Sequence, residues 1–202
     1  MHSHKTPPRK EDIAELKPFE GLDIERIFVI TTAAEAEEAM HVLMQAGSVG
    51  FDTESKPTFQ KGERSTGPHV LQFATVERAY IFQAHAEDCL PVILRLLESV
   101  EVRKIGFGLG GDLSHISSRF GIRPSSIVDL DTSFRKLGYR NAVGAKSAIA
   151  ILFQRRMSKS KATTTSNWSN RSLSERQLVY AANDAYAAIR VFHALREEGL
   201  VS

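Results

Sequence analysis

Hydrophobic and polar positions form alternating blocks along the chain, and these blocks predict short strands and helices. The apolar run RIFVIT at residues 26–31 predicts a strand, and AAEAEEAMHVLMQA at 33–46 has the apolar spacing of a helix. Thr31 or Thr32 can cap the start of this helix, and Gly47 can end it. The next run, SVGFDTE at 48–54, predicts a buried strand. Together these blocks predict a strand, a helix and a second strand.

The middle of the chain predicts an antiparallel meander followed by alternating helices and strands. HVLQFAT at 69–75 and RAYIFQA at 78–84 join SVGFDTE in the meander, after a polar loop at 55–68. Further predicted elements are a helix at 90–100, a strand at 102–108, a helix at 111–120, a strand at 126–130 and helices near 131–138 and 144–153. This order predicts an α/β fold with a mixed β-sheet flanked by helices.

The last third of the chain predicts a polar loop and one long helix. Residues 154–170 are rich in serine, threonine and basic side chains, which favours a loop. From residue 172 to 199 the pattern predicts a helix, with Ser172 and Glu175 forming a capping box at its start. No internal repeat and no second domain boundary is visible.

Composition narrows the classes of protein that remain. The chain has 202 residues and a formal charge of +2, but residues 135–176 hold ten basic residues and a single acid, Glu175. That segment is either a solvated face or a surface for a polyanion. The single cysteine, Cys89, excludes an internal disulfide. No apolar run is long enough to span a membrane or resembles a signal peptide, so we expect a cytoplasmic protein without a membrane partner.

Two carboxylates stand at the end of the strand SVGFDTE. Asp52 and Glu54 are two residues apart, so their side chains share one face of the strand. Like charges this close repel each other unless a cation lies between them, and a metal ion is the obvious candidate. The alternative is a strand end that meets solvent.

Two further acidic positions follow in sequence. Asp112 comes directly after the glycine-rich stretch GFGLGG, where it either reaches a shared site or caps a helix. Tyr180 and Asp184 are four residues apart in the last helix and therefore share a face, although Tyr180 can also pack in the core. The glycines suggest a dinucleotide-binding enzyme, but their spacing does not match that motif. If the carboxylates converge, their oxygen ligands suit Mg²⁺ or Mn²⁺.

The order FDTE, GFGLGGD and YAANDAY resembles the three motifs of the DEDDy-type 3′-5′ exonucleases. The segment SNWSNRSLSERQLVYAANDAY is similar to ribonuclease D and to the exonuclease domain of the Werner syndrome protein. The resemblance extends over residues 26–196 and implies a ribonuclease H-like fold. It also implies an exonuclease domain at 21–202. The N-terminus MHSHKTPPRKED is polar with two prolines, and we expect residues 1–20 to form a flexible tail.

The resemblance implies a metal-dependent 3′-5′ exonuclease that hydrolyses DNA, RNA or both to nucleoside 5′-monophosphates with two Mg²⁺ or Mn²⁺ ions. Tyr180 would position the attacking water, because a phenol with a pKa near ~10 is a poor base at neutral pH. The implied metal ligands are Asp52, Glu54, Asp112 and Asp184. The expected substrate is a single-stranded or 3′-end nucleic acid.

Further residues are candidates for substrate contacts. The implied contacts to the terminal nucleotide are Leu71, Gln72 and Phe73, and the implied contacts to the phosphate backbone are Arg155, Arg156 and Lys159. Leu71 and Phe73 are alternatively core residues, and we expect Trp168 to pack under the last helix. His115 is expected to support the site from outside it or to be structural. Lys56 departs from the family, whose members often have an apolar or aromatic residue there.

A competing hypothesis is a catalytically inactive nucleic-acid-binding or adaptor module on the same fold. Loss of a metal-binding carboxylate would favour it, but all four carboxylates and the tyrosine are present. The two hypotheses differ in one observable, which is whether nucleic acid is shortened in the presence of a divalent metal.

Overall fold

A six-stranded mixed sheet forms the centre of the protein in a computed structural model that describes residues 5–58 and 65–201. The strand order is β2-β5-β4-β3-β6-β7, in which β3, β4 and β5 are antiparallel neighbours and the other pairs are parallel. The strands are β2 (Ile27–Ile30), β3 (Ser48–Glu54), β4 (Val70–Ala74), β5 (Ala79–Gln83), β6 (Arg103–Gly106) and β7 (Ile127–Asp129). The predicted meander and mixed sheet are confirmed. Part of the predicted polar loop, at 59–64, lies outside the described residues.

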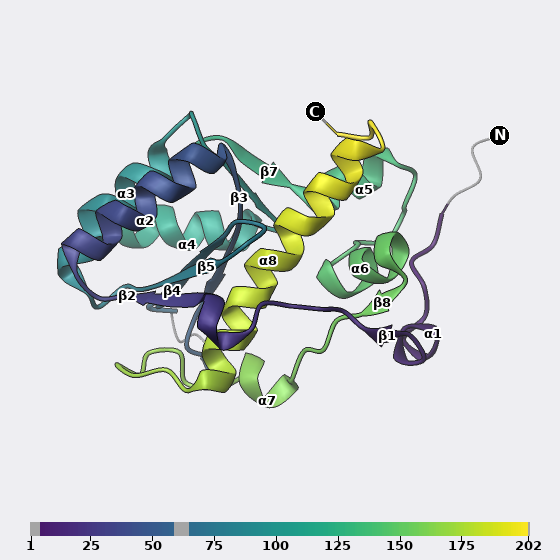
Figure 1. The fold of residues 1–202 in the computed structure, drawn as a ribbon, viewed down its shortest axis with the longest axis horizontal. Helices are drawn as coiled ribbons and strands as arrows, with labels where there is room; N and C mark the ends of the chain where they lie inside the picture. Colours follow the sequence, from purple (N-terminus) through teal and green to yellow (C-terminus); the bar gives the residue numbers. More distant parts are fainter. Residues whose placement is uncertain (1–4, 59–64, 202) are drawn as a thin grey trace.

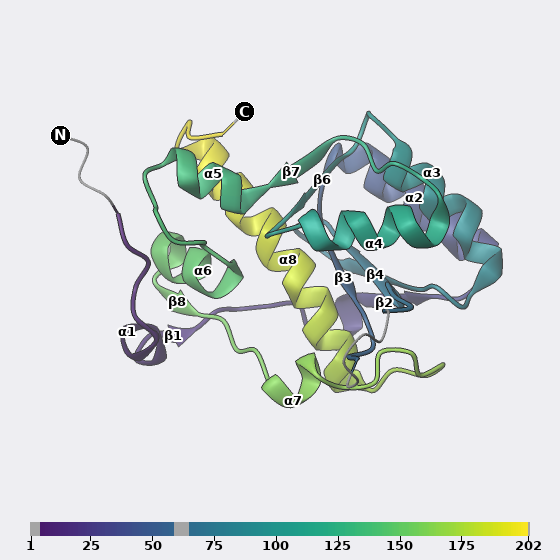
Figure 2. The same cartoon turned by 180° about the vertical axis from the view of Figure 1, so that it is seen from behind.

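Helices cover both faces of this sheet (Figures 1 and 2). One buried cluster joins the sheet to α2 (Ala33–Ala46), α3 (Leu90–Glu98) and α4 (Gly110–Phe120). The other joins it to α5 (Leu130–Lys136), α6 (Ala145–Phe153) and α8 (Glu175–Glu197). Single 3₁₀ turns at Ile24–Arg26 and Glu87–Cys89 precede β2 and α3. Both faces are therefore buried, which fits the apolar character of the central strands.

The long helix α8 lies unusually close to β3. A side chain at Gly50 would collide with the backbone oxygen of Ala185, so the helix can approach the strand only because Gly50 has no Cβ. On the other face, the rings of Phe51 and Phe73 pack with centroids 5.0 Å apart. This packing fixes the end of β3 relative to α8, where the candidate carboxylates lie.

Helix ends agree with the sequence at one site and differ at another. Of the two threonines predicted to cap α2, Thr32 is the N-cap, and it forms a capping box with Glu35. At α8 the predicted capping box of Ser172 and Glu175 is wrong. The helix begins at Glu175, so Ser174 is the N-cap and pairs with Gln177. Both serines fit the sequence pattern of a cap, but Ser172 lies two residues before the actual N-cap, Ser174.

Residues 5–20, the described part of the N-terminal region, differ from the expected flexible tail at 1–20. They contain α1 (Lys10–Ala14) and β1 (Lys17–Pro18), and β1 pairs in parallel with β8 (Arg155–Arg156). Ile13 is buried, and the backbone N–H of Phe19 donates to the oxygen of Arg156 at 3.0 Å. Residues 154–170, expected to form a loop, contain β8 and the short helix α7 (Lys161–Thr164). Elements this short are held by contacts distant in sequence, which local patterns do not show.

None of the helices in the described part of the chain is long and apolar enough to cross a membrane.

Candidate active site

Three carboxylates from two elements meet at the end of β3. Asp52 and Glu54 extend from the strand and Asp184 extends from α8, and each contributes an oxygen to a group within 4.8 Å of one another. Asp184 is only 5% exposed. The structure therefore brings together three of the four carboxylates that the sequence suggested as ligands, in an arrangement that can hold a metal ion.

Asp112 lies beside this group rather than in it. It occupies the first turn of α4, and its carboxylate accepts a hydrogen bond from the hydroxyl of Thr53. Thr53 lies between Asp52 and Glu54 in sequence, so its side chain points to the other face of the strand. Asp112 is thus attached to the same strand end as the other carboxylates, but through Thr53, which no motif in the sequence singles out.

The three grouped carboxylates lie in an environment that opposes their charge. Burial, followed by the charges of Asp184 and Asp112, raises the pKa of Asp52 to about 8. Burial, followed by the charge of Asp52, raises the pKa of Glu54 to about 9. The pKa of Asp184 is also raised by burial. Its Oδ1 atom is buried without a hydrogen-bond partner among the described residues. The three carboxylates therefore lack the positive charge that would stabilise their ionised forms.

One side chain supplies part of that charge. The Nζ atom of Lys159 lies 2.8 Å from Oδ2 of Asp184, and the lysine side chain is 25% exposed. The ammonium also lies 5.6 Å from the ring centroid of Tyr180. Burial lowers the pKa of Lys159, but the neighbouring acids outweigh it, so that the pKa is raised overall. The residue expected to contact phosphate is therefore a counter-ion of the carboxylates in this structure.

The hydroxyl of Tyr180 is held by a neighbouring helix. It lies 2.9 Å from the hydroxyl oxygen of Thr164 in α7. Burial and the charge of Asp184 raise the pKa of Tyr180 to about 12, so the phenol is protonated at neutral pH. Trp168 is fully buried, and its indole N–H donates to the backbone oxygen of Thr164 at 3.3 Å. The expectation that Trp168 packs under the last helix is confirmed.

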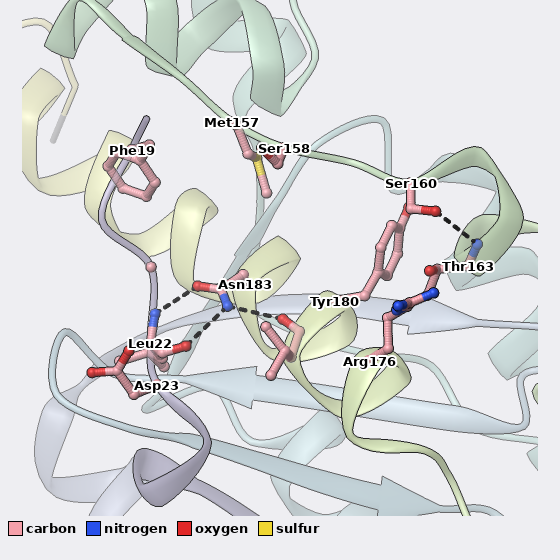
Figure 3. A pocket seen from close by; sticks show the side chains of 12 residues that line it. Phe19, Leu22, Asp23, Met157, Ser158, Ser160, Thr163, Arg176, Tyr180 and Asn183 are labelled. Carbon is pink, nitrogen blue, oxygen red and sulfur yellow. Dashed lines mark hydrogen bonds between the residues drawn. The ribbon is translucent and has the colours of Figure 1, made fainter. Parts of the chain in front are cut away.

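The segment 157–165 contributes both of these contacts, through Lys159 to Asp184 and through Thr164 to Tyr180. Tyr180 also forms part of the wall of a hollow of about 460 Å³ between this segment, α8 and residues 19–23 (Figure 3). Asn183 anchors the far wall, because its side chain accepts from the N–H of Leu22 at 2.7 Å. No motif spacing in the sequence singles out Thr164 or Asn183.

The three candidates on β4 have different environments. Leu71 and Phe73 have no exposed surface and belong to the core cluster that includes Phe51, as the alternative interpretation had it. Gln72 faces the other way and is paired in register with Asp52 across the sheet. Its amide atoms are buried without a hydrogen-bond partner among the described residues. Of the three, Gln72 is the polar side chain beside the carboxylates.

The two candidate arginines also differ from each other. Arg155 is exposed and donates to the backbone oxygen of Gln154 at 3.1 Å. Arg156 is half-buried and donates to the backbone oxygen of Leu16 at 3.4 Å, which ties β8 to the N-terminal region.

His115 and Lys56 lie near the edge of the site. His115 is exposed on α4, one turn after Asp112. The backbone N–H of Lys56 donates to Nδ1 of His69 at 3.1 Å. His115 is therefore not in the ligand set of the grouped carboxylates and lies outside that group, as expected.

Two backbone amides of the glycine-rich stretch before α4 already donate to an acidic side chain. The backbone N–H groups of Gly108 and Leu109 donate to the carboxylate of Asp129 at 2.9 and 3.0 Å. A dinucleotide loop binds pyrophosphate through such amides, and an acidic side chain occupies them here. This contradicts the dinucleotide-binding hypothesis.

Known proteins that this chain resembles are described as 3′-5′ exonucleases. A family model described as 3′-5′ exonuclease matches residues 27–199. The chain is 30% identical over 166 residues to the bifunctional 3′-5′ exonuclease/ATP-dependent helicase WRN of Mus musculus, covering 81% of this chain and 12% of that protein. It is also 30% identical over 152 residues to a 3′-5′ exonuclease of Arabidopsis thaliana, covering 74% and 52%. The chain thus spans about half or less of these curated relatives.

Solved structures share the fold. The structure of Trypanosoma brucei RNase D in complex with RNA U12 superimposes with a TM-score of 0.73 at 20% identity, covering 92% of this chain and 64% of that one. Ribonuclease D has a ribonuclease H-like fold, so the expected fold class is confirmed.

Proposed function

This chain belongs to the 3′-5′ exonuclease family, and from that membership we propose that it hydrolyses nucleic acid from the 3′ end to nucleoside 5′-monophosphates. The observation that carries the proposal is the meeting of Asp52, Glu54 and Asp184 within 4.8 Å. A protein gains nothing in stability from three carboxylates held this close together, because each opposes the ionisation of the others. Such a group is typical of a site that binds cations for phosphoryl transfer.

The side chains present fit divalent metal ions. Asp52, Glu54 and Asp184 would hold them, with Asp112 as a further oxygen ligand at the same strand end. The buried Oδ1 of Asp184 supports this, because no hydrogen-bond donor reaches it among the described residues. A bound cation would supply the missing partner. An oxygen-only donor set suits Mg²⁺ or Mn²⁺. Two such ions, when bound, supply Lewis-acid stabilisation for an in-line displacement at phosphorus.

Tyr180 would position the attacking water rather than remove its proton. Because the pKa of its hydroxyl is raised to about 12, the phenol keeps its proton at neutral pH and can form hydrogen bonds without acting as a base. Thr164 now accepts or donates the hydrogen bond to that hydroxyl. We propose that a substrate would take over this contact.

Nucleic acid is the proposed substrate, and both DNA and RNA remain within the proposal. One solved neighbour is a ribonuclease D bound to RNA, which supports a polynucleotide as ligand for this fold. Gln72, beside Asp52, is a better candidate for contact with the terminal nucleotide than the buried Leu71 and Phe73. An exonuclease domain at 21–202 and a cytoplasmic location stay predictions.

A second candidate function has one observation in its favour. Lys159 places a permanent cation against Asp184, as would suit a protein that binds nucleic acid without metal. A catalytically inactive binding or adaptor module would keep this ion pair in all its states. In an exonuclease, metal binding would break this ion pair, because Asp184 would then bind the metal instead of Lys159.

A gel assay separates these two functions. Matched 5′-labelled DNA and RNA strands are incubated with Mg²⁺, with Mn²⁺ and with EDTA, alongside a folded Asp52→Asn variant. The exonuclease proposal predicts a ladder shortening from the 3′ end with metal only, and none from the variant. Strands left intact under every metal condition would overturn the proposal, and equal shortening by Asp52→Asn would overturn the assignment of Asp52.

A further inference from the structure

A second hollow, on the other side of residues 157–160, is lined by basic side chains. It has a volume of about 580 Å³ and lies between α1, the start of α6 and residues 156–160. Its charged lining residues are all basic, namely Lys10, Lys146, Arg156 and Lys159, and within the described residues no acid lines it. We call these four residues and the hollow between them the basic groove. We propose that the basic groove binds the phosphate backbone of the strand whose 3′ end lies at the carboxylates, an inference that rests on the proposed function.

The basic groove is continuous with the carboxylate group through one residue. Lys159 lines the groove, and its Nζ lies 2.8 Å from Asp184. Lys146, at the other side of the groove, is close enough that its charge lowers the pKa of Asp184. A strand that presents its 3′ end to the carboxylates must leave the site through a neighbouring hollow. The groove offers positive charge along that route.

The N-terminal region builds the outer wall of the groove. Lys10, Ile13 and Ala14 have the i, i+3, i+4 spacing of one helix face, and all three line the groove. Asp12 does not line it and instead pairs with Arg9 at 3.0 Å. The helix α1 is acidic overall, yet it turns its lysine towards the groove. Burial of Ile13 and the pairing of β1 with β8 hold it there.

Lys159 pairs with Asp184, but the other three cations of the groove are not neutralised within the described part of the protein. Neither Lys10, Lys146 nor Arg156 forms an ion pair in the part of the chain that the structure describes. Unpaired cations lining one concavity remain available to an anionic ligand. The hollow of Figure 3 differs, because its charged lining residues are one acid and one base, Asp23 and Arg176. Phosphate groups should therefore follow the basic groove.

The test measures binding without hydrolysis. In an Asp52→Asn background with EDTA, fluorescence anisotropy follows a labelled single strand of about 12 nucleotides over a series of salt concentrations. Lys10→Ala/Lys146→Ala removes two exposed cations from opposite walls of the groove. Lys136→Ala/Arg123→Ala removes two exposed cations that do not line it. Circular dichroism and thermal melting establish that both variants are folded.

Counterion release sets the expected size of the effect. Loss of two phosphate contacts should reduce the slope of log K against log salt by about 1.4 and weaken binding roughly 25-fold at about 0.1 M salt. The control pair should keep the slope of the parent. The difference between the groove variant and the parent should also shrink as the strand is shortened towards a dinucleotide, which is too short to follow the groove.

Each outcome decides one question. An unchanged slope in Lys10→Ala/Lys146→Ala, or an equal loss in the control pair, would overturn the basic groove as the path of the strand. The gel assay on the wild-type protein tests hydrolysis separately. If the wild type shortens no strand while the groove variant loses salt-dependent binding, the exonuclease proposal fails and the groove remains a nucleic-acid-binding surface.

Discussion

The two sides of the candidate site are built in different ways. On one side, β3 and α8 carry Asp52, Glu54 and Asp184 on regular elements that are locked together by sheet pairing and by the close approach at Gly50. On the other side, the segment 157–165 reaches the same site with Lys159 and Thr164, through one ion pair and one hydrogen bond. We call β3 and α8 the rigid side, and it fixes the positions of the three carboxylates. The segment 157–165 supplies contacts to them that a ligand can replace.

This difference predicts a ranking of mutational effects. Replacing a carboxylate on the rigid side removes a metal ligand, which no neighbour can substitute. Replacing a side chain of the segment changes charge or access, but leaves the ligands where they are. The predictions below test that ranking, beginning with the largest effect.

Asp52→Asn should lower the rate of metal-dependent hydrolysis by on the order of a thousandfold or more, because it removes a ligand oxygen at a metal site. The change keeps the shape of the side chain and removes one of the repelling charges. The metal-free variant should therefore melt at a higher temperature than the metal-free wild type. Initial rates on a labelled strand and thermal melting in EDTA check both parts. Asp88→Asn, at an exposed position, is the control and should match the wild type. A fully active Asp52→Asn would contradict the ranking.

Tyr180→Phe should slow cleavage by on the order of a hundredfold, since it removes the hydroxyl that positions the water but no ligand. Binding of Mn²⁺ should be unaffected. Thr164→Val is the matched variant, because it breaks the same hydrogen bond from the other side and keeps the phenol. Single-turnover rates of the two variants are compared. If both slow the reaction equally, the hydrogen bond itself matters and Tyr180 does not act on the water.

Lys159→Met should increase the affinity for Mn²⁺ on the order of tenfold, because the ammonium competes with a metal ion for Asp184. The metal-free variant should be less stable than the wild type, since the carboxylates lose their counter-ion. Isothermal titration with Mn²⁺ and thermal melting in EDTA measure these changes. Lys161→Met, at an exposed position of the same segment, serves as the control. An unchanged Mn²⁺ affinity in Lys159→Met would show that Lys159 and metal do not compete.

The smallest effect concerns pH. In the metal-free protein the pKa of Asp52 is about 8 and that of Glu54 about 9, both above the values near ~4 of an unfolded chain. At pH values between those of the unfolded chain, near ~4, and those of the folded protein, the folded state binds more protons than the unfolded state. The free energy of unfolding therefore falls as the pH rises through this range. Melting in EDTA should occur at lower temperature at about pH 9 than at about pH 6, and Asp52→Asn should reduce the difference. A melting temperature that rises over this range would contradict the assigned pKa shifts.

The sequence predicted the rigid side better than the segment. Alternation in SVGFDTE placed Asp52 and Glu54 on one face, and the helical spacing of Tyr180 and Asp184 placed both on one side of α8. These predictions depend on local periodicity, which a sequence shows directly. The family resemblance supplied the ribonuclease H-like fold, which periodicity alone did not specify.

The contacts that the sequence missed all depend on tertiary approach. Lys159 reaches Asp184 from another part of the chain, and Asn183 binds Leu22 from the N-terminal region. The N-terminal region was expected to be a tail because it is polar and contains prolines. Its order depends on pairing with β8, more than one hundred residues away. Local sequence patterns carry no information on such pairings.

The central claim is that Asp52, Glu54 and Asp184 form a divalent metal site. Titration of the metal-free protein with Mn²⁺, followed by the electron paramagnetic resonance signal of free Mn²⁺, tests it without any substrate. The account predicts saturable binding to the wild type and to Asp88→Asn, and loss of that binding in Asp184→Asn. Binding to Asp184→Asn that equals that of the wild type would contradict the claim.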